Sequence, residues 1–126
     1  MLVLDSGGLS WLATRDRAAA ALITELLERD LWPPLVPSMV LVESLTGSPT
    51  RDANTNRFLK TCLIEPNVTT TTARRAADLR TNARRGSAVD ALVVALAEPG
   101  HTVLTADPQD LRALAASAHN VTIQEV

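Results

Sequence analysis

Short apolar runs alternate along the chain with longer segments whose apolar residues recur at helical spacing. The short runs are rich in β-forming residues and predict strands at residues 1–5, 35–37, 62–66, 101–107 and 120–126. The longer segments have apolar positions three or four residues apart and predict helices at residues 7–15, 16–30, 39–47, 50–61, 69–85, 87–97 and 108–118. This alternation indicates an α/β protein with a mostly parallel central sheet covered by helices.

The segment 39–47 is apolar nearly all round, and neighbouring residues predict both of its ends. Ser38 is placed to cap its first turn, and Gly47 is placed to stop it. No linker or repeat interrupts the chain, so we expect one domain that covers residues 1–126.

Composition narrows the class of protein. The 126 residues are 46% hydrophobic and carry a net charge of −2, so the chain is not a basic nucleic-acid binder as a whole. Any contact with nucleic acid must therefore come from a local patch. The chain has one cysteine, shows no signal peptide, and has no apolar run of the roughly 18 residues that cross a bilayer. We expect a cytoplasmic protein that does not associate with membranes.

An aspartate interrupts the apolar helix "SAVDALVVALA". Asp90 is the only formal charge from Gly86 through Ala97, and helical spacing puts it on the same side as Val93 and Val94. Burying such a charge without a partner costs several kcal/mol or shifts its pKa.

Three other acids are equally isolated. Asp5 and Asp107 end predicted strands, and Glu43 lies inside the apolar segment 39–47. Ligand sites in open α/β sheets form beyond the carboxyl ends of the strands, and the first turns of the helices that carry Glu43 and Asp90 could reach the same rim. Like charges at such a rim would hold protons or a cation. Without nearby histidine or cysteine ligands, carboxylate oxygens suit Mg²⁺ or Mn²⁺, which predicts metal-assisted phosphodiester hydrolysis.

Each acid also has a simpler interpretation. Asp5 and Asp107 could each cap the helix that follows, and Asp110 could be a solvated acid favoured by a helix dipole. Glu43 and Asp90 could each be paired with a buried arginine. The combination of four isolated acids, two of them at strand ends, favours a shared site.

The order of these acids resembles the PIN-domain family, and specifically the VapC toxin ribonucleases of bacterial toxin–antitoxin pairs. The resemblance covers the whole chain and rests on the four blocks "VLDSGGL", "VPSMVLVESL", "GSAVDALVVALA" and "VLTADPQDL". It implies a three-layer α/β/α PIN-like fold and a Mg²⁺-dependent endoribonuclease. It also implies a structured RNA substrate such as tRNA or rRNA, a homodimer, and a VapB-like cognate antitoxin that blocks the site.

The resemblance also implies roles for individual residues. Asp5 and Asp90 would hold the metal most directly, and Glu43 and Asp107 would complete the cluster directly or through water. Asp110 is the alternative fourth acid. The supporting hydroxyls would be those of Ser6 and Thr105.

Arginines supply the candidate contacts to RNA phosphates. Arg84 and Arg85 lie immediately before the Asp90 block and could border the cleft. The alternative is a solvated helix face with pairs such as Arg74 to Asp78. The few aromatic residues lie among apolar positions, which favours core packing or an interface.

Two other functions remain open at this point. One keeps the PIN fold but makes the protein a housekeeping nuclease in RNA processing, or a nuclease that acts on DNA. The other is a non-catalytic PIN-like scaffold that only binds a partner. Replacing Asp90 by asparagine separates these readings, because a scaffold would keep its effect in cells and a nuclease would lose it.

Overall fold

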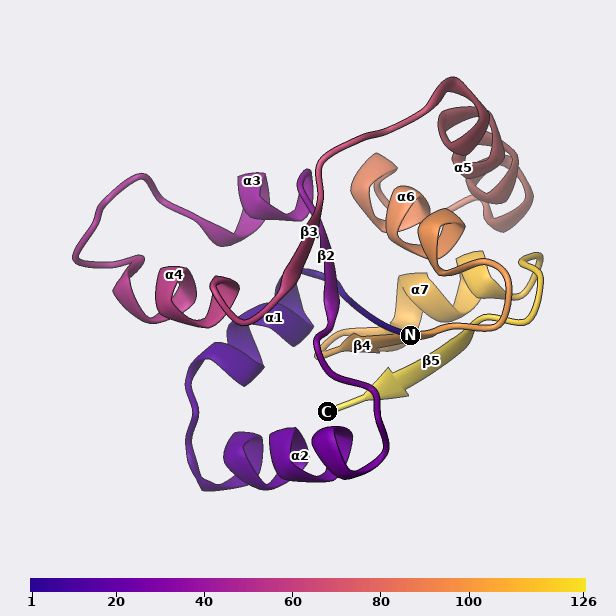
Figure 1. The fold of residues 1–126 in the computed structure, drawn as a ribbon. Helices are drawn as coiled ribbons and strands as arrows, with labels where there is room; N and C mark the ends of the chain where they lie inside the picture. The colour runs from indigo at the N-terminus through magenta and orange to yellow at the C-terminus, as the bar shows by residue number, and fades with distance from the viewer.

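The computed structural model describes all of residues 1–126, and at its centre lies a sheet of five mutually parallel strands (Figure 1). The strands are β1 (Leu2–Leu4), β2 (Leu35–Pro37), β3 (Leu63–Glu65), β4 (Thr102–Thr105) and β5 (Thr122–Glu125). Their order across the sheet is β3-β2-β1-β4-β5. The α/β class and the parallel sheet predicted from the sequence are confirmed.

Helices cover both faces of this sheet. One group connects β1 to β2 and β2 to β3, and it comprises α1 (Ser6–Ala13), α2 (Arg17–Glu28), α3 (Val40–Ser44) and α4 (Ala53–Leu59). The other comprises α5 (Thr70–Ala83), α6 (Ala88–Ala97) and α7 (Pro108–Ala115). Because parallel crossovers are right-handed, connections that run in opposite directions along a sheet lie on opposite faces. Figure 1 shows the two groups on either side of the strands, which gives the three-layer α/β/α fold.

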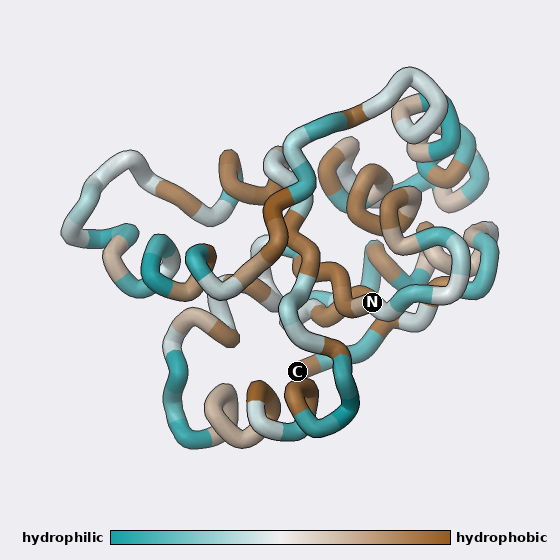
Figure 2. Tube along the Cα trace, viewed as in Figure 1, coloured by the Kyte–Doolittle hydropathy of each residue, from teal (hydrophilic) through white to brown (hydrophobic).

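The central strands β1 and β4 are mostly apolar because both of their faces are covered, whereas the edge strands β3 and β5 are partly exposed. Leu2, Val3 and Leu4 of β1 are fully buried, as are Val103 and Leu104 of β4. A parallel sheet between two helical layers favours apolar residues at every position instead of alternation. Figure 2 shows the strands and α6 mostly in hydrophobic colours, whereas α5 carries many hydrophilic positions. No helix is long and apolar enough to cross a membrane.

Helix α3 differs from the sequence prediction at both ends. It runs only from Val40 to Ser44, so Gly47 does not stop it, and Met39 occupies the N-cap position without a side-chain hydrogen bond. The Ser38 hydroxyl instead donates to the Pro66 carbonyl at 3.4 Å, which ties β2 to the segment that follows β3. A helix of five residues has little stability of its own, so its packing against the rest of the fold sets where it begins and ends.

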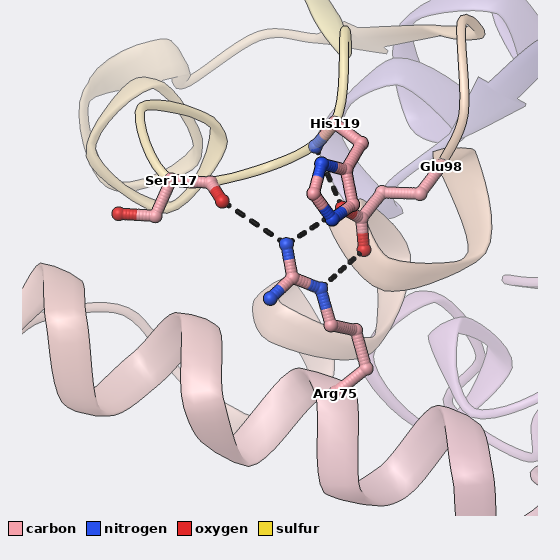
Figure 3. A network of polar contacts seen from close by, with 4 residues as sticks. All are labelled: Arg75, Glu98, Ser117 and His119. Atoms are coloured by element: carbon pink, nitrogen blue, oxygen red, sulfur yellow. Dashed lines mark hydrogen bonds and ion pairs between the residues drawn. The ribbon is translucent and has the colours of Figure 1, made fainter.

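A polar network holds the second helical layer together (Figure 3). The Arg75 guanidinium of α5 donates two hydrogen bonds of 2.8 Å to the Glu98 carboxylate at the end of α6, and a third of 3.0 Å to the Ser117 carbonyl. The His119 amide donates to the same carboxylate at 2.7 Å. These contacts lower the pKa of Glu98, first through the hydrogen bonds from Arg75. The Arg74–Asp78 pair that the alternative interpretation of the arginines offered does not form.

Candidate metal and catalytic site

The two central strands define the point where the chain changes direction across the sheet. From β1 the connections proceed toward β2, and from β4 they proceed toward β5. Ligand sites of open α/β sheets lie at such switch points, beyond the carboxyl ends of the strands. The register pairs Leu2 with Thr102 and Leu4 with Leu104, so the next residues, Asp5 and Thr105, meet at this edge.

Asp5 is the central group of this edge. Its side chain is buried, with 8% of the residue exposed. One carboxylate oxygen, Oδ2, accepts a hydrogen bond of 2.6 Å from the Thr105 hydroxyl, and the other, Oδ1, accepts one of 2.7 Å from the Gly8 amide. Asp5 therefore does cap helix α1, and it does so while facing the other predicted site residues.

The electrostatics of Asp5 indicate a carboxylate that lacks a cationic partner. Burial raises its pKa above the ordinary value of 3.8, and the negative charges of Asp90 and Asp107 raise it further. The hydrogen bonds from Thr105 and Gly8 act in the opposite direction, but the net result is a raised pKa. No arginine, lysine or histidine forms an ion pair with any of the three acids.

Gly8 has a role that the sequence patterns did not reveal. A Cβ atom at this position would collide with the carbonyl group of Leu104, so only glycine lets helix α1 approach strand β4 this closely. The Gly8 amide donates to Asp5, which also accepts from Thr105, so the close approach of α1 to β4 occurs where Asp5 is held. The signal available in the sequence was the pair of glycines directly after "DS".

Asp90 is placed by a capping box at the start of α6. The Ser87 hydroxyl accepts a hydrogen bond from the Asp90 amide at 3.0 Å, and the Asp90 carboxylate accepts one from the Ser87 amide at 3.2 Å. Val93 and Val94 on the adjoining face are fully buried, whereas Asp90 is half-buried at the rim. This local reciprocity, and not an arginine, is what satisfies Asp90 in the protein.

The fourth sequence block separates into two aspartates with different surroundings. Asp107 is exposed, makes no side-chain cap for α7, and donates its amide to the Thr105 hydroxyl at 3.0 Å. Asp110 forms an ion pair with Arg85, with 2.6 Å between Nε and Oδ1. Of the two, Asp107 is the one whose charge reaches Asp5.

Glu43 is not joined to this group in the structure. It is exposed on α3 and is absent from the charges that act on Asp5. Ser6 is half-buried in the first turn of α1 and makes no side-chain hydrogen bond to the acids. The metal roles expected for Glu43 and the supporting role expected for Ser6 stay predictions.

The oxygen atoms at this edge fit a divalent cation. Asp5, Asp90 and Asp107 offer only oxygen atoms, and Asp5 is buried among like charges, which suits a hard cation such as Mg²⁺ or Mn²⁺. No three acidic, histidine or cysteine side chains approach closely enough to form a complete ligand group. Mg²⁺ usually takes one or two carboxylates and keeps several waters, so Asp5 with Asp90 would be sufficient to hold it.

The fold is shared with solved structures, although the sequence has diverged. The chain matches VapBC2 from Rickettsia felis, in a structure with a DNA fragment from their promoter, at 14% identity over 99% of this chain and 98% of that one, with a TM-score of 0.73. It matches a toxin–antitoxin complex from Klebsiella pneumoniae at 20% identity over the full length of both chains, with a TM-score of 0.68.

A third match is FitAcB from Neisseria gonorrhoeae, at 17% identity over 98% of this chain and 96% of that one, with a TM-score of 0.64. Comparison with protein-family models gave no match, and comparison with curated proteins gave none. At these identities the similarity establishes that the chain has the fold of these proteins.

Proposed function

We propose that the protein is a Mg²⁺-dependent endoribonuclease that acts as the toxin of a VapBC-type toxin–antitoxin system. The observation that carries the proposal is the buried Asp5 carboxylate at the switch point, close to Asp90 and Asp107 and without a cationic partner. The sequence blocks that resemble the VapC family and the fold shared with VapBC2 and a toxin–antitoxin complex support the same assignment.

In this proposal each side chain has a defined task. Asp5 and Asp90 hold the cation, and Asp107 and Glu43 contribute directly or through water. The Thr105 hydroxyl keeps Asp5 oriented, because it donates to Oδ2 and receives the Asp107 amide. When bound, Mg²⁺ supplies an activated water and neutralises charge on the phosphate that is cut. A toxin of this kind would act in the cytoplasm, where its RNA substrates occur.

RNA cleavage by the purified chain is the direct test. We expect cleavage of tRNA or rRNA with Mg²⁺ or Mn²⁺, and none after a chelator is added. Asp90→Asn should lower the rate by at least about 100-fold. Asparagine retains the oxygen that accepts the Ser87 amide, so the capping box survives and the loss reflects the missing charge.

Asp16→Asn provides a matched control. Asp16 also caps a helix, because its Oδ1 accepts the Ala19 amide at 2.9 Å, and it belongs to none of the proposed site groups. We expect this variant to cleave at the normal rate. Growth arrest in cells that survives Asp90→Asn would refute the nuclease and favour the scaffold, whereas preference for DNA would favour the housekeeping or DNA-directed alternative.

The proposal includes a cognate antitoxin and a homodimer. An apolar hollow of about 300 Å³ beside α2 is lined in part by Ile23, Leu27 and Trp32, and Leu27 is 53% exposed there. We expect this hollow to receive an antitoxin segment, since one of the proteins that share the fold was solved as a toxin–antitoxin complex. Leu27→Glu should then weaken co-purification with the small protein encoded beside the toxin.

Edge strand β3, with Leu63 and Ile64 exposed, is the first surface to test for the homodimer.

A further inference from the structure

The turn between α5 and α6 forms a basic groove outside the acid cluster. The groove has a volume of about 400 Å³ and is lined by Ala77, Arg80, Thr81, Arg84, Arg85 and Gly86. Three of these residues carry guanidinium groups, one carries a hydroxyl, and one has an apolar side chain. The protein as a whole has a charge of −2, so this groove concentrates charge of the opposite sign to the rest of the chain.

The backbone of the turn holds these arginines in place. Arg84 ends α5 in the left-handed conformation with a φ of 57°, and its amide donates to the Arg80 carbonyl. Gly86 has a φ of 92°, and a Cβ there would come within 2.7 Å of the Leu114 side chain of α7. The turn therefore packs against Leu114, and the Arg80 guanidinium donates to the Gly86 carbonyl at 3.3 Å.

The three arginines are only partly neutralised. Arg85 pairs with Asp110, and neither Arg80 nor Arg84 forms an ion pair with a carboxylate. One carboxylate against three guanidinium groups leaves an excess of two positive charges in the groove. Favourable interaction of cations with the C-terminal end of α5 explains why arginines are tolerated there, but it does not explain why three of them converge with a threonine on one hollow.

Asp110 adds a competitor for one of these cations. The side chains of Arg85 and Asp110 are 45% and 44% exposed, and exposed pairs of this kind contribute little net stability. A phosphodiester group offers Arg85 a bidentate partner with the same single charge as Asp110. A polyanion brings further phosphates to Arg80 and Arg84 and releases counterions, so it can displace Asp110 from Arg85.

We propose that Arg80, Thr81, Arg84 and Arg85 form a subsite for the RNA backbone that holds a phosphate other than the one cut, and that Asp110 weakens RNA binding by competing for Arg85. The proposal rests on the ribonuclease function proposed above. The groove contains no aromatic side chain on which a base could stack, so it contacts the backbone and does not read sequence. It extends the contacts expected for Arg84 and Arg85 to a site of defined shape.

Binding can be measured separately from cleavage. A fluorescein-labelled 20-nucleotide single-stranded RNA is titrated with the full chain in EDTA, and fluorescence anisotropy gives the Kd at several salt concentrations. Arg84→Gln and Arg80→Gln should each weaken binding about 3- to 10-fold and lower the slope of log Kd against log salt by about 0.7. Asp110→Asn should tighten binding by up to about 5-fold, and this gain should vanish when Arg85→Gln is also present.

Arg74→Gln is the matched control, because it removes the same charge from an exposed arginine of the same helix that does not line the groove. We expect it to leave the Kd nearly unchanged. The proposal is overturned if Arg74→Gln weakens binding as much as the groove variants, or if Asp110→Asn does not tighten it. It is also overturned if a DNA strand of the same sequence binds more tightly than the RNA. Thermal melts verify that each variant is folded.

This experiment keeps the two proposals distinguishable. If the wild-type chain shows no Mg²⁺-dependent cleavage, the ribonuclease proposal is refuted and the binding results in EDTA still stand. Normal cleavage with equal RNA binding by all variants would refute the groove and leave the ribonuclease intact.

Discussion

Asp5 and Asp52 are the buried acids of the protein, with 8% and 5% of each residue exposed, and each occupies the position before a helix. Asp5 accepts one backbone and one hydroxyl hydrogen bond, and two further carboxylates act on it. Asp52 accepts hydrogen bonds from the Thr46 amide, the Thr46 hydroxyl and the Gly47 amide. Burial raises the pKa of Asp5, and the Thr46 amide lowers the pKa of Asp52.

The difference lies in what covers each carboxylate. Asp52 is enclosed by its own loop, whose amides and hydroxyl group compensate the charge where it stands. Asp5 is enclosed by the core at the switch point, and its hydrogen bonds do not offset burial and repulsion. A carboxylate whose charge is satisfied by hydrogen bonds from the protein, such as Asp52, organises a loop. A buried carboxylate whose hydrogen bonds do not satisfy its charge, such as Asp5, can be stabilised by a cation.

Among the variants that test this difference, Asp5→Asn should have the largest effect on RNA cleavage. Removing the charge eliminates both the repulsion and the burial cost. Asparagine keeps the Gly8 hydrogen bond through Oδ1, and its Nδ2 can donate to the Thr105 hydroxyl oxygen in place of the bond that Oδ2 accepted, so the free energy of unfolding should stay equal or rise by up to about 1 kcal/mol. Cleavage of RNA should fall by at least about 100-fold because a cation ligand is lost. Urea unfolding and initial cleavage rates measure the two effects.

Thermal shift with metal gives Asp5→Asn an independent readout. At Mg²⁺ concentrations ten times the Kd, the wild-type protein should gain about 1.4 kcal/mol of stability, and the variant should gain much less. If the variant is clearly less stable than the wild type without metal, Asp5 is a structural residue like Asp52 and the contrast between them fails.

Gly8→Ala should have the next largest effect. The added methyl group would meet the Leu104 carbonyl, which is backbone and cannot rotate away, so α1 and β4 must separate. We expect a loss of about 2–3 kcal/mol of stability by urea unfolding, with slower cleavage because Asp5 loses its partner amide.

Gly7→Ala is the control for Gly8→Ala. A Cβ at Gly7 would lie 3.2 Å from the Ala106 Cβ and amide nitrogen, which is a tight contact but one that small shifts can relieve. Its cost should be clearly smaller. Equal costs for the two variants would mean that helix propensity, and not the approach of α1 to β4, governs this turn.

Thr105→Val should produce an intermediate effect. It removes the hydroxyl that donates to Asp5 and receives the Asp107 amide, so the pKa of Asp5 should rise further. We expect a loss of about 1–2 kcal/mol in stability and about 10-fold in cleavage rate. Thr105→Ser keeps the hydroxyl and should retain most of both. If the valine variant cleaves normally, Thr105 does not orient Asp5.

Local patterns predicted most of the strands and helices and the meeting of Asp5 with Thr105 at the sheet edge, because both depend on periodicity and strand ends. The apolar run of β1 and the helical face around Asp90 are periodic signals, and parallel strands bring Asp5 beside Thr105. The ends of α3 were predicted wrongly because so short a helix is fixed by contacts such as that of Ser38 with Pro66.

Contacts that form only once the chain is folded leave no periodic pattern in the sequence. The loop that encloses Asp52 depends on backbone amides five and six residues away, and the flanking polar sequence "TRDAN" gives no sign of burial. The pair of Arg85 with Asp110 joins residues 25 positions apart, so the sequence could not show which aspartate remained free of arginine.

The response to pH should give the smallest effect and the most specific one. The pKa of Asp5 is raised above the ordinary value of 3.8, and the pKa of Asp52 is lowered below it. Asp5 has a raised native pKa, so its charge reduces stability at neutral pH, and this reduction disappears as the pH falls through the raised value toward 3.8. Asp52 has a lowered native pKa, so its contribution is complete above 3.8 and is lost as the pH falls below that value.

Urea unfolding of the wild type, Asp5→Asn and Asp52→Asn between pH 7 and pH 3 separates these two windows. Asp5→Asn should be at least as stable as the wild type at pH 7, and the difference should close before the pH reaches 3.8. Asp52→Asn should be less stable than the wild type, and its deficit should persist to 3.8 and shrink only below it. Saturating Mg²⁺ should suppress the first window, because a bound cation stabilises the charged form of Asp5, and should leave the second unchanged. A pH response of Asp5 that matched that of Asp52 in sign would remove the electrostatic basis for a metal at the switch point.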